Sequence, residues 1–174
     1  MLKNEKGQAV APKTVTMTKK DFEDQGNTRV YWLGGGGAMI NDHGTVIMID
    51  PLLEGFDMPL LIDMPIDVKD VPHVDAILVS HVDNDHYSRP TCKDLKAVCK
   101  EYHTSYYVAS LMKEECDVDG IGHDIGDHIQ INDIDVELTP ADHAWQNQVA
   151  KYNYRVWEER EYCGFYVRTP TKKI

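Results

Sequence analysis

Short runs of apolar and β-branched residues recur through the first half of the chain and predict β-strands. Residues 29–33, 38–41 and 45–50 are runs of this kind, and they are separated by a run of four glycines and by an Asp-His-Gly segment. Tight turns between short strands are typical of an antiparallel meander. A further run, residues 74–79, is apolar almost throughout and predicts a buried strand.

Helical and strand patterns alternate in the middle of the chain. Ser88 can cap a helix that has Pro90 in its first turn, and the apolar spacing extends this helix to about Tyr102. A strand is then expected over residues 105–109 and a short helix over residues 111–116. The order of these elements requires crossover connections between strands.

The apolar period returns to two in the C-terminal part. Residues 129–131 and 134–138 alternate between apolar and polar side chains, with Asn132 and Asp133 as the turn between them. This pattern predicts a β-hairpin, and a last strand is expected over residues 162–168. Hairpins mixed with crossovers predict an α/β fold of layered architecture with mixed sheets.

The first 28 residues differ in character from the rest. They are polar and contain several lysines, but they lack the continuous apolar region of a signal peptide. No segment of the chain approaches the length of a membrane span, so no membrane association is expected. We therefore divide the chain into a polar N-terminal segment, residues 1–28, and one domain, residues 29–174.

Charge and cysteine content restrict the partners and the compartment. The net charge of −11 argues against a protein that binds nucleic acid by neutralising phosphates. The four cysteines form no Cys-x-x-Cys pair, and Cys92 and Cys99 would lie on one face of the predicted helix. We interpret them as reduced packing residues of a cytoplasmic protein. The sequence leaves the oligomeric state open, with a homo-oligomer as one alternative.

Side chains that can bind metal ions are most closely spaced in residues 80–86, directly after the predicted buried strand. This stretch places His81, Asp83, Asp85 and His86 within six positions. In an extended loop, side chains at positions i and i+2 point the same way, so His81 and Asp83 can share one ion. Asp85 and His86 are adjacent and can reach a second ion. The spacing therefore favours a site for two metal ions.

A further histidine, His143, follows the predicted hairpin strand 134–138 and is where a distant ligand should arrive. Simpler interpretations remain open. Asp83 and Asn84 could form an acidic turn that bonds its own backbone, and His143 could be a surface histidine. A calcium loop beginning at Asp83 would lack the required glycine and glutamate at its sixth and twelfth positions.

On these residues the chain resembles the metallo-β-lactamase superfamily of metal-dependent hydrolases. The usual signature is His-x-His-x-Asp-His after a strand, followed by a histidine after a later hairpin and preceded by an aspartate that ends an early strand. Residues 81–86, His143 and Asp50 correspond to these features. Residues 31–34, Tyr-Trp-Leu-Gly, are similar to the branch that contains the ascorbate-6-phosphate lactonases. The resemblance implies a layered αββα fold with mixed β-sheets.

The resemblance also implies a set of metal ligands, which are His81, Asp83, Asp85, His86 and His143. His81, Asp83 and His143 would hold one ion, and Asp85 and His86 would begin the second site. The expected cofactor is one or two divalent ions of manganese, zinc or iron. Asp83 stands where the family usually has its second histidine, and this hard oxygen ligand favours manganese, iron or magnesium relative to zinc, although the general order of affinities still favours zinc.

The implied reaction is hydrolysis of an ester, lactone or phosphodiester bond in a small molecule by a metal-bound hydroxide, with Asp85 and His81 as catalytic residues. Asp50 would hydrogen-bond the loop or a ligand histidine, although it could simply form a turn. Trp145 lies in a polar and aromatic segment after His143 and is the first candidate for a substrate contact. That segment could instead be an exposed lid.

The expected ligand set is incomplete. Family members normally supply a bridging aspartate and a final histidine from their C-terminal half, whereas no histidine follows His143 in this chain. We therefore expect the chain to correspond to the N-terminal part of a complete member, with the C-terminal part missing. The alternative function is a truncated or degenerate domain that holds a structural metal ion without catalysis.

Overall fold

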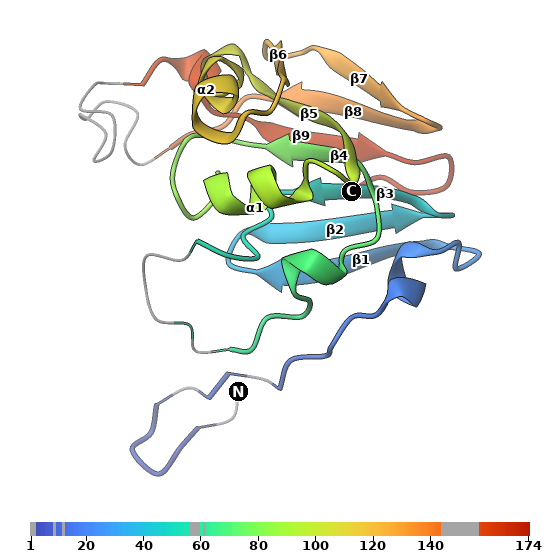
Figure 1. Cartoon of the computed structure of the whole chain (residues 1–174), viewed down its shortest axis with the longest axis vertical. Coiled ribbons are helices and arrows are strands. Elements are labelled where there is room, and N and C mark those ends of the chain that lie inside the picture. The colour runs from blue at the N-terminus through green and yellow to red at the C-terminus, as the bar shows by residue number, and fades with distance from the viewer. Residues whose placement is uncertain (1–2, 9, 12, 56–59, 61, 144–156) are drawn as a thin grey trace.

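The structure, a computed structural model, describes residues 3–8, 10–11, 13–55, 60, 62–143 and 157–174. Its strands form one six-stranded sheet in the order β1-β2-β3-β4-β5-β6 and one three-stranded sheet in the order β7-β8-β9 (Figure 1). The strands are β1 (Thr28–Gly34), β2 (Gly37–Asp42), β3 (Thr45–Ile49), β4 (Val74–Val79), β5 (Cys99–Ser105), β6 (Gly120–His123), β7 (His128–Ile131), β8 (Ile134–Thr139) and β9 (Gly164–Arg168). The helices are α1 (Arg89–Leu95) and α2 (Tyr106–Cys116), with short 3-10 turns η1 (Lys19–Phe22), η2 (Val68–Asp70) and η3 (Glu159–Glu161).

The six-stranded sheet is mixed. Its first three strands form the predicted antiparallel meander, and the strands from β3 to β6 run parallel. Because parallel strands end at the same edge of a sheet, the loops that follow β3, β4, β5 and β6 lie along one edge. The turn between β1 and β2 reaches the same edge, since β2 runs antiparallel to β3.

Side chains on the two faces of this sheet enter two different cores. Ile77 on β4 packs in the cluster that includes residues of α1 and α2, whereas Leu78 packs against the three-stranded sheet. Both helices lie on one face of the sheet (Figure 1). Every residue of β4 is buried, because both of its neighbours are parallel strands and both of its faces are covered. The predicted α/β layers with mixed sheets are confirmed.

The predicted elements between Ser88 and residue 116 are only partly correct. Ser88 does cap α1, since its hydroxyl accepts a hydrogen bond from the Thr91 backbone N–H, but the helix ends at Leu95 and does not continue to Tyr102. The strand expected over residues 105–109 lies earlier, at β5. The helix expected over residues 111–116 is α2, which begins after Ser105 instead.

Tertiary pairing explains these corrections. Tyr102 and Thr104 on β5 pair with Ile77 and Val79 of β4, so sheet formation overrides the helical spacing of this segment. Cys99 therefore belongs to a strand, and the expectation that it shares a helix face with Cys92 is wrong. Strand β6 was not predicted, because its Gly-Ile-Gly-His sequence has no clear alternation of apolar and polar residues.

Part of the N-terminal segment packs against the domain. Met17 and Phe22 are buried, and the Met17 backbone N–H donates a hydrogen bond to the Pro65 carbonyl at 2.7 Å. The division of the chain at residue 28 stays a prediction. Within the ranges that the structure describes, no helix has both the length and the apolar character that crossing a bilayer requires.

Candidate metal centre

The candidate site forms where three loops meet at one edge of the six-stranded sheet. Asp50 directly follows β3, and Ser80 and His81 directly follow β4. His143 arrives from the other sheet, four residues after the end of β8. The local sequence explains this arrangement, because β3 and β4 are apolar runs and β8 alternates between apolar and polar residues, and each pattern ends shortly before the polar residues of the site.

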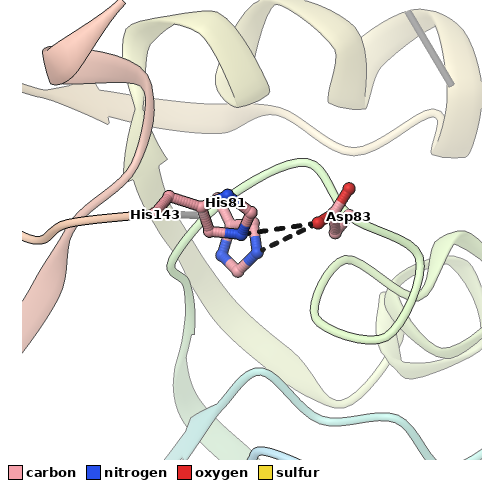
Figure 2. Close-up of side chains that lie close together, drawn as sticks. All are labelled: His81, Asp83 and His143. Atoms are coloured by element: carbon pink, nitrogen blue, oxygen red, sulfur yellow. Dashed lines mark ion pairs between the residues drawn. The ribbon is translucent and has the colours of Figure 1, made fainter. Parts of the chain in front are cut away.

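His81, Asp83 and His143 converge in space, although His143 is distant in sequence. The Nε2 atom of His81 lies 3.6 Å from Oδ2 of Asp83, and the Nε2 atom of His143 lies 3.5 Å from the same oxygen (Figure 2). Within the described part of the chain, these three residues are the one group of three or more His, Cys, Asp or Glu side chains with ligand atoms close enough to hold a metal ion.

The separations of these atoms fit coordination of one ion. Two ligand atoms that each lie about 2.1 Å from a tetrahedrally coordinated ion are about 3.4 Å apart. The distances of 3.5 and 3.6 Å from Asp83 to the two imidazole nitrogens are close to that value and are long for hydrogen bonds. Two imidazoles and one carboxylate could therefore hold a divalent ion.

The proton on His81 can be located from its neighbours. The Ser80 hydroxyl donates its proton to Oδ2 of Asp50 at 2.6 Å, and Nδ1 of His81 lies 2.8 Å from the same hydroxyl oxygen. Since the serine proton is already committed to the carboxylate, Nδ1 of His81 must be the donor to the serine oxygen. The unprotonated nitrogen of His81 is then Nε2, which faces Asp83.

The environment of His81 keeps this imidazole neutral. Burial, together with the charges of His86 and His143 when protonated, lowers the pKa of His81 to about 3. Its Nε2 atom is buried and has no hydrogen-bond partner among the described residues. An unpaired buried nitrogen is costly in a folded protein, and metal coordination would satisfy it.

Asp50 hydrogen-bonds to Ser80 and to the candidate ligand His86. It is buried, and its carboxylate accepts hydrogen bonds from the Ser80 backbone N–H at 2.7 Å, from the Ser80 hydroxyl and from Nδ1 of His86 at 2.8 Å. Its backbone adopts a φ of 44°, which is uncommon for a residue other than glycine. The expected hydrogen bond of Asp50 to a candidate ligand histidine is present in this geometry.

His86 and Asp85 form the second part of the predicted ligand set. His86 donates Nδ1–H to Asp50, which leaves its Nε2 atom unprotonated in the neutral ring, and this atom lies 3.8 Å from Oδ2 of Asp85. The Asp85 side chain is 66% exposed. Burial opposes protonation of His86, but the hydrogen bond and negative charge of Asp50 outweigh it, so the pKa of His86 is raised.

Two residues of the site were not predicted. Ser80 links Asp50 to His81 by hydrogen bonds. Its position directly before the loop of candidate ligands was the one feature of the sequence that could have indicated this role. Trp157 is buried, and its ring centroid lies 4.7 Å from that of His143 and 5.7 Å from that of His81. No local pattern places an aromatic residue against ligands so distant in sequence. Trp145, the predicted substrate contact, lies outside the described residues.

A comparison with known protein families identifies the family of this chain. The family described as the beta-lactamase superfamily domain matches residues 45–174. The chain belongs to the beta-lactamase superfamily. This match includes the loop at residues 81–86 together with Asp50 and His143, so every described member of the predicted site lies within the superfamily domain.

Solved structures of other proteins share the fold. CmlA, a diiron beta-hydroxylase from Streptomyces venezuelae, has a TM-score of 0.67 at 14% identity, over 84% of this chain and 28% of CmlA. Igni18, a metallo hydrolase from the hyperthermophilic archaeon Ignicoccus hospitalis, has a TM-score of 0.61 at 16% identity, over 84% of this chain and 58% of Igni18. An isothiocyanate hydrolase from Delia radicum gut bacteria has a TM-score of 0.55 at 17% identity, over 81% and 58% of the two chains.

These comparisons confirm the predicted metallo-β-lactamase-like fold. At such identities each likeness to a solved structure shows the fold alone. The chain spans 28% of the length of CmlA and 58% of the length of the other two proteins. No curated protein matches the chain.

Proposed function

We propose that this chain carries the metal-binding residues of a hydrolase that cleaves an ester, lactone or phosphodiester bond in a small molecule. One observation carries the proposal, which is the unpaired, buried Nε2 atom of His81 facing Asp83, with His143 on the other side of that carboxylate. The superfamily match over residues 45–174 supports hydrolysis as the reaction class.

The residues of the site have separate roles in this proposal. His81, Asp83 and His143 hold one divalent ion, and His86 with Asp85 contributes to a second. When bound, such ions lower the pKa of a water molecule toward neutrality and polarise a carbonyl or phosphoryl oxygen of the substrate. The exposed carboxylate of Asp85 can accept a hydrogen bond from a water molecule and orient it toward the substrate.

A lactone or a related small ester is the substrate class that we favour. The support is the Tyr-Trp-Leu-Gly sequence at residues 31–34, which is similar to the ascorbate-6-phosphate lactonase branch. Trp145 remains our candidate for a substrate contact beside the metal. The net charge of −11 supports the absence of nucleic acid among the partners.

The test begins with chain stripped of metal by a chelator and reloaded separately with manganese, iron or zinc. Hydrolysis is then followed with a simple lactone, 4-nitrophenyl acetate and bis(4-nitrophenyl) phosphate, and metal content is measured by elemental mass spectrometry. We expect metal-dependent turnover that is lost in His81→Ala and kept in His103→Ala. Bound metal without turnover would favour the alternative of a structural metal site without catalysis, and a folded chain that binds no metal would contradict both.

A second candidate function, oxygen chemistry at iron, is favoured by the donor set. Two histidines and one carboxylate are the ligands typical of non-haem iron(II) oxygenases. The similarity in fold to the diiron beta-hydroxylase CmlA points in the same direction. Oxygen consumption by the iron-loaded chain, with no hydrolysis in its zinc-loaded form, would select this function over the first.

The cytoplasmic location and the homo-oligomeric state complete the proposal. All four cysteines carry free thiols, which supports a reducing compartment. Burial raises the pKa of Cys99 to about 11 and that of Cys163 to about 12, so neither forms a reactive thiolate near neutral pH. Light scattering of the purified chain tests the oligomeric state.

A further inference from the structure

The turn between β1 and β2 contacts the metal-binding loop. Gly36 in this turn lies against the imidazole of His86. A Cβ atom at Gly36 would lie 2.9 Å from Cε1 and 3.4 Å from Nδ1 of that ring. The shorter separation is inside the van der Waals contact of two carbon atoms, so a side chain at position 36 would force either the imidazole or the turn to move.

The reason for glycine at this position is space and not backbone conformation. The adjacent Gly35 has a φ of +55°, which favours glycine, but a Cβ atom there would meet no atom within 4 Å. Gly36 is not among the residues with positive φ. The two neighbouring glycines therefore serve different purposes, and Gly35 provides a matched control for Gly36.

The imidazole of His86 is held from two directions. Its Nδ1–H donates to Asp50 at 2.8 Å, while the Gly36 backbone closes off the space beside Cε1. The turn also packs against the backbone of Asp50, because a Cβ atom at Gly37 would lie 3.0 Å from the Asp50 carbonyl oxygen. The turn therefore lies against both the imidazole and the residue that accepts its hydrogen bond.

Trp32 forms a hydrogen bond to the turn between β1 and β2. The indole N–H of Trp32 donates a hydrogen bond to the Gly35 carbonyl at 3.0 Å. Trp32 is 59% exposed. Burial of its ring therefore accounts for only part of the stabilisation that Trp32 gives to the turn. The Gly35 carbonyl belongs to the peptide that links Gly35 to Gly36, so the indole hydrogen bond restrains the backbone next to the residue that lies against the imidazole.

We propose that the β1–β2 turn is a positioning element of the metal centre, in which Gly36 holds His86 against Asp50 so that Nε2 of His86 stays available beside Asp85. This inference rests on the proposed function in one respect, namely that His86 is a ligand. The turn lies outside residues 45–174, so the superfamily domain obtains part of its site from the preceding hairpin.

A double-mutant cycle on the metal-free full chain tests the contact. The variants are Gly36→Ala, His86→Ala and the two combined, and the measurement is the midpoint of urea unfolding. Gly36→Ala should lower the midpoint when the imidazole is present and should have little effect in the His86→Ala background, where the added methyl group has room. An equal shift in both backgrounds would overturn the proposal.

A spectroscopic readout separates positioning from general destabilisation. In the metal-free chain, Gly36→Ala should shift the imidazole nitrogen resonances of His86 and leave those of His103 in place, whereas Gly35→Asn should move neither. Unchanged His86 resonances in folded Gly36→Ala would overturn the proposal. If Gly36→Ala does not fold, Trp32→Phe removes the indole donor while keeping an aromatic ring, and it should shift the same His86 resonances by a smaller amount. No shift would again overturn the proposal.

These measurements also separate this inference from the proposed function. Neither requires bound metal or turnover, so His86 can prove to be positioned by Gly36 in a chain that hydrolyses nothing. If the cycle shows coupling, the metal-loaded chain can then be compared with Gly36→Ala by elemental mass spectrometry. We expect the variant to lose its second equivalent of metal before its first, because the three atoms nearest to a Cβ atom at Gly36 all belong to His86, the candidate ligand of the second ion.

Discussion

Two clusters of histidines lie on or directly after neighbouring strands of the same sheet, and among the described residues one of them contributes to a candidate metal site. His81 follows β4, whereas His103 on β5 pairs with His123 on β6. Both His81 and His103 are buried, and burial lowers the pKa of each. By burial and by the direction of the pKa shift alone, His81 and His103 would be indistinguishable.

The difference lies in which nitrogen atoms already have partners. Nδ1 of His103 lies 2.9 Å from Nε2 of His123, and Nε2 of His103 lies 3.0 Å from Oε2 of Glu101, so both ring nitrogens are hydrogen-bonded. His81 uses only Nδ1, and its Nε2 atom has no such partner among the described residues. A depressed histidine pKa is therefore a sign of burial, while an unpaired buried nitrogen is the stronger sign of a ligand.

The largest expected effect is loss of metal on removing His81. In His81→Ala, bound metal should fall to near zero, because one of three converging ligands is gone. His103→Ala, the matched variant, should keep its metal and lose stability instead, by about 1–3 kcal/mol, since Glu101 and His123 each lose a partner. Elemental mass spectrometry and urea unfolding measure the two effects. Equal loss of metal in both variants would remove the distinction between the clusters.

Asp50→Asn should be the next most severe change. The amide oxygen must replace Oδ1, which accepts the Ser80 backbone N–H, so the amide nitrogen would replace Oδ2 and donate toward Nδ1 of His86. His86 would then carry its proton on Nε2, the atom proposed to bind metal. We expect metal affinity to fall by about 10–100-fold.

The affinity of Asp50→Asn is measured by competition of the metal against a chromophoric chelator. Glu101→Gln is the matched control, because it makes the corresponding carboxylate-to-amide change beside His103. It should leave metal affinity unchanged. An Asp50→Asn variant that binds metal as tightly as the parent chain would show that the carboxylate does not set the tautomer of His86.

Ser80→Ala should have a smaller effect in the same direction. The change removes the hydroxyl that fixes the proton on Nδ1 of His81, but the carboxylate of Asp50 remains. We expect metal affinity to fall by about 10-fold or less, which is the lower end of the loss expected when a group that hydrogen-bonds to a metal ligand is removed. Restoration of the parent affinity in Ser80→Thr, which keeps a hydroxyl, would confirm the assignment, whereas an unchanged affinity in Ser80→Ala would contradict it.

The smallest expected effect concerns the pH dependence of stability. Burial lowers the pKa of His103, although the hydrogen bond and charge of Glu101 oppose this. Below the ordinary histidine pKa of about 6.5, the unfolded chain therefore binds more protons at this residue than the folded chain, and stability falls as the pH is lowered. His103→Leu should show a shallower fall in unfolding free energy between about pH 7 and pH 5.

Urea unfolding of the metal-free chain at several pH values measures this slope. The metal-free form is needed because ion binding at the other cluster is itself dependent on pH. His81 contributes equally to the parent chain and to His103→Leu, so the difference between their slopes reports on the His103 cluster. Parallel curves for the two proteins would mean that His103 has the same proton affinity in the folded and unfolded states.

Much of the fold could be predicted because its elements have strong local patterns. The meander, β4 and the hairpin of β7 and β8 were found from apolar runs and alternation. The segment from Lys96 to Ser105 was misassigned, since its residues tolerate a helix and only pairing with β4 makes it a strand. The loop residues His81, Asp83, Asp85 and His86 were predicted from spacing, and their roles as ligands remain predictions.

The sequence by itself determined, to within one residue, where β3, β4 and β8 end, and which candidate ligand types follow them. These properties depend on residues that are close together in the chain, so periodicity and spacing reveal them. Only the tertiary structure decided which nitrogen of each histidine is available and that Gly36 contacts His86. These features depend on contacts between β3, β4 and the β1–β2 turn, and no local pattern encodes the distance between atoms that folding brings together.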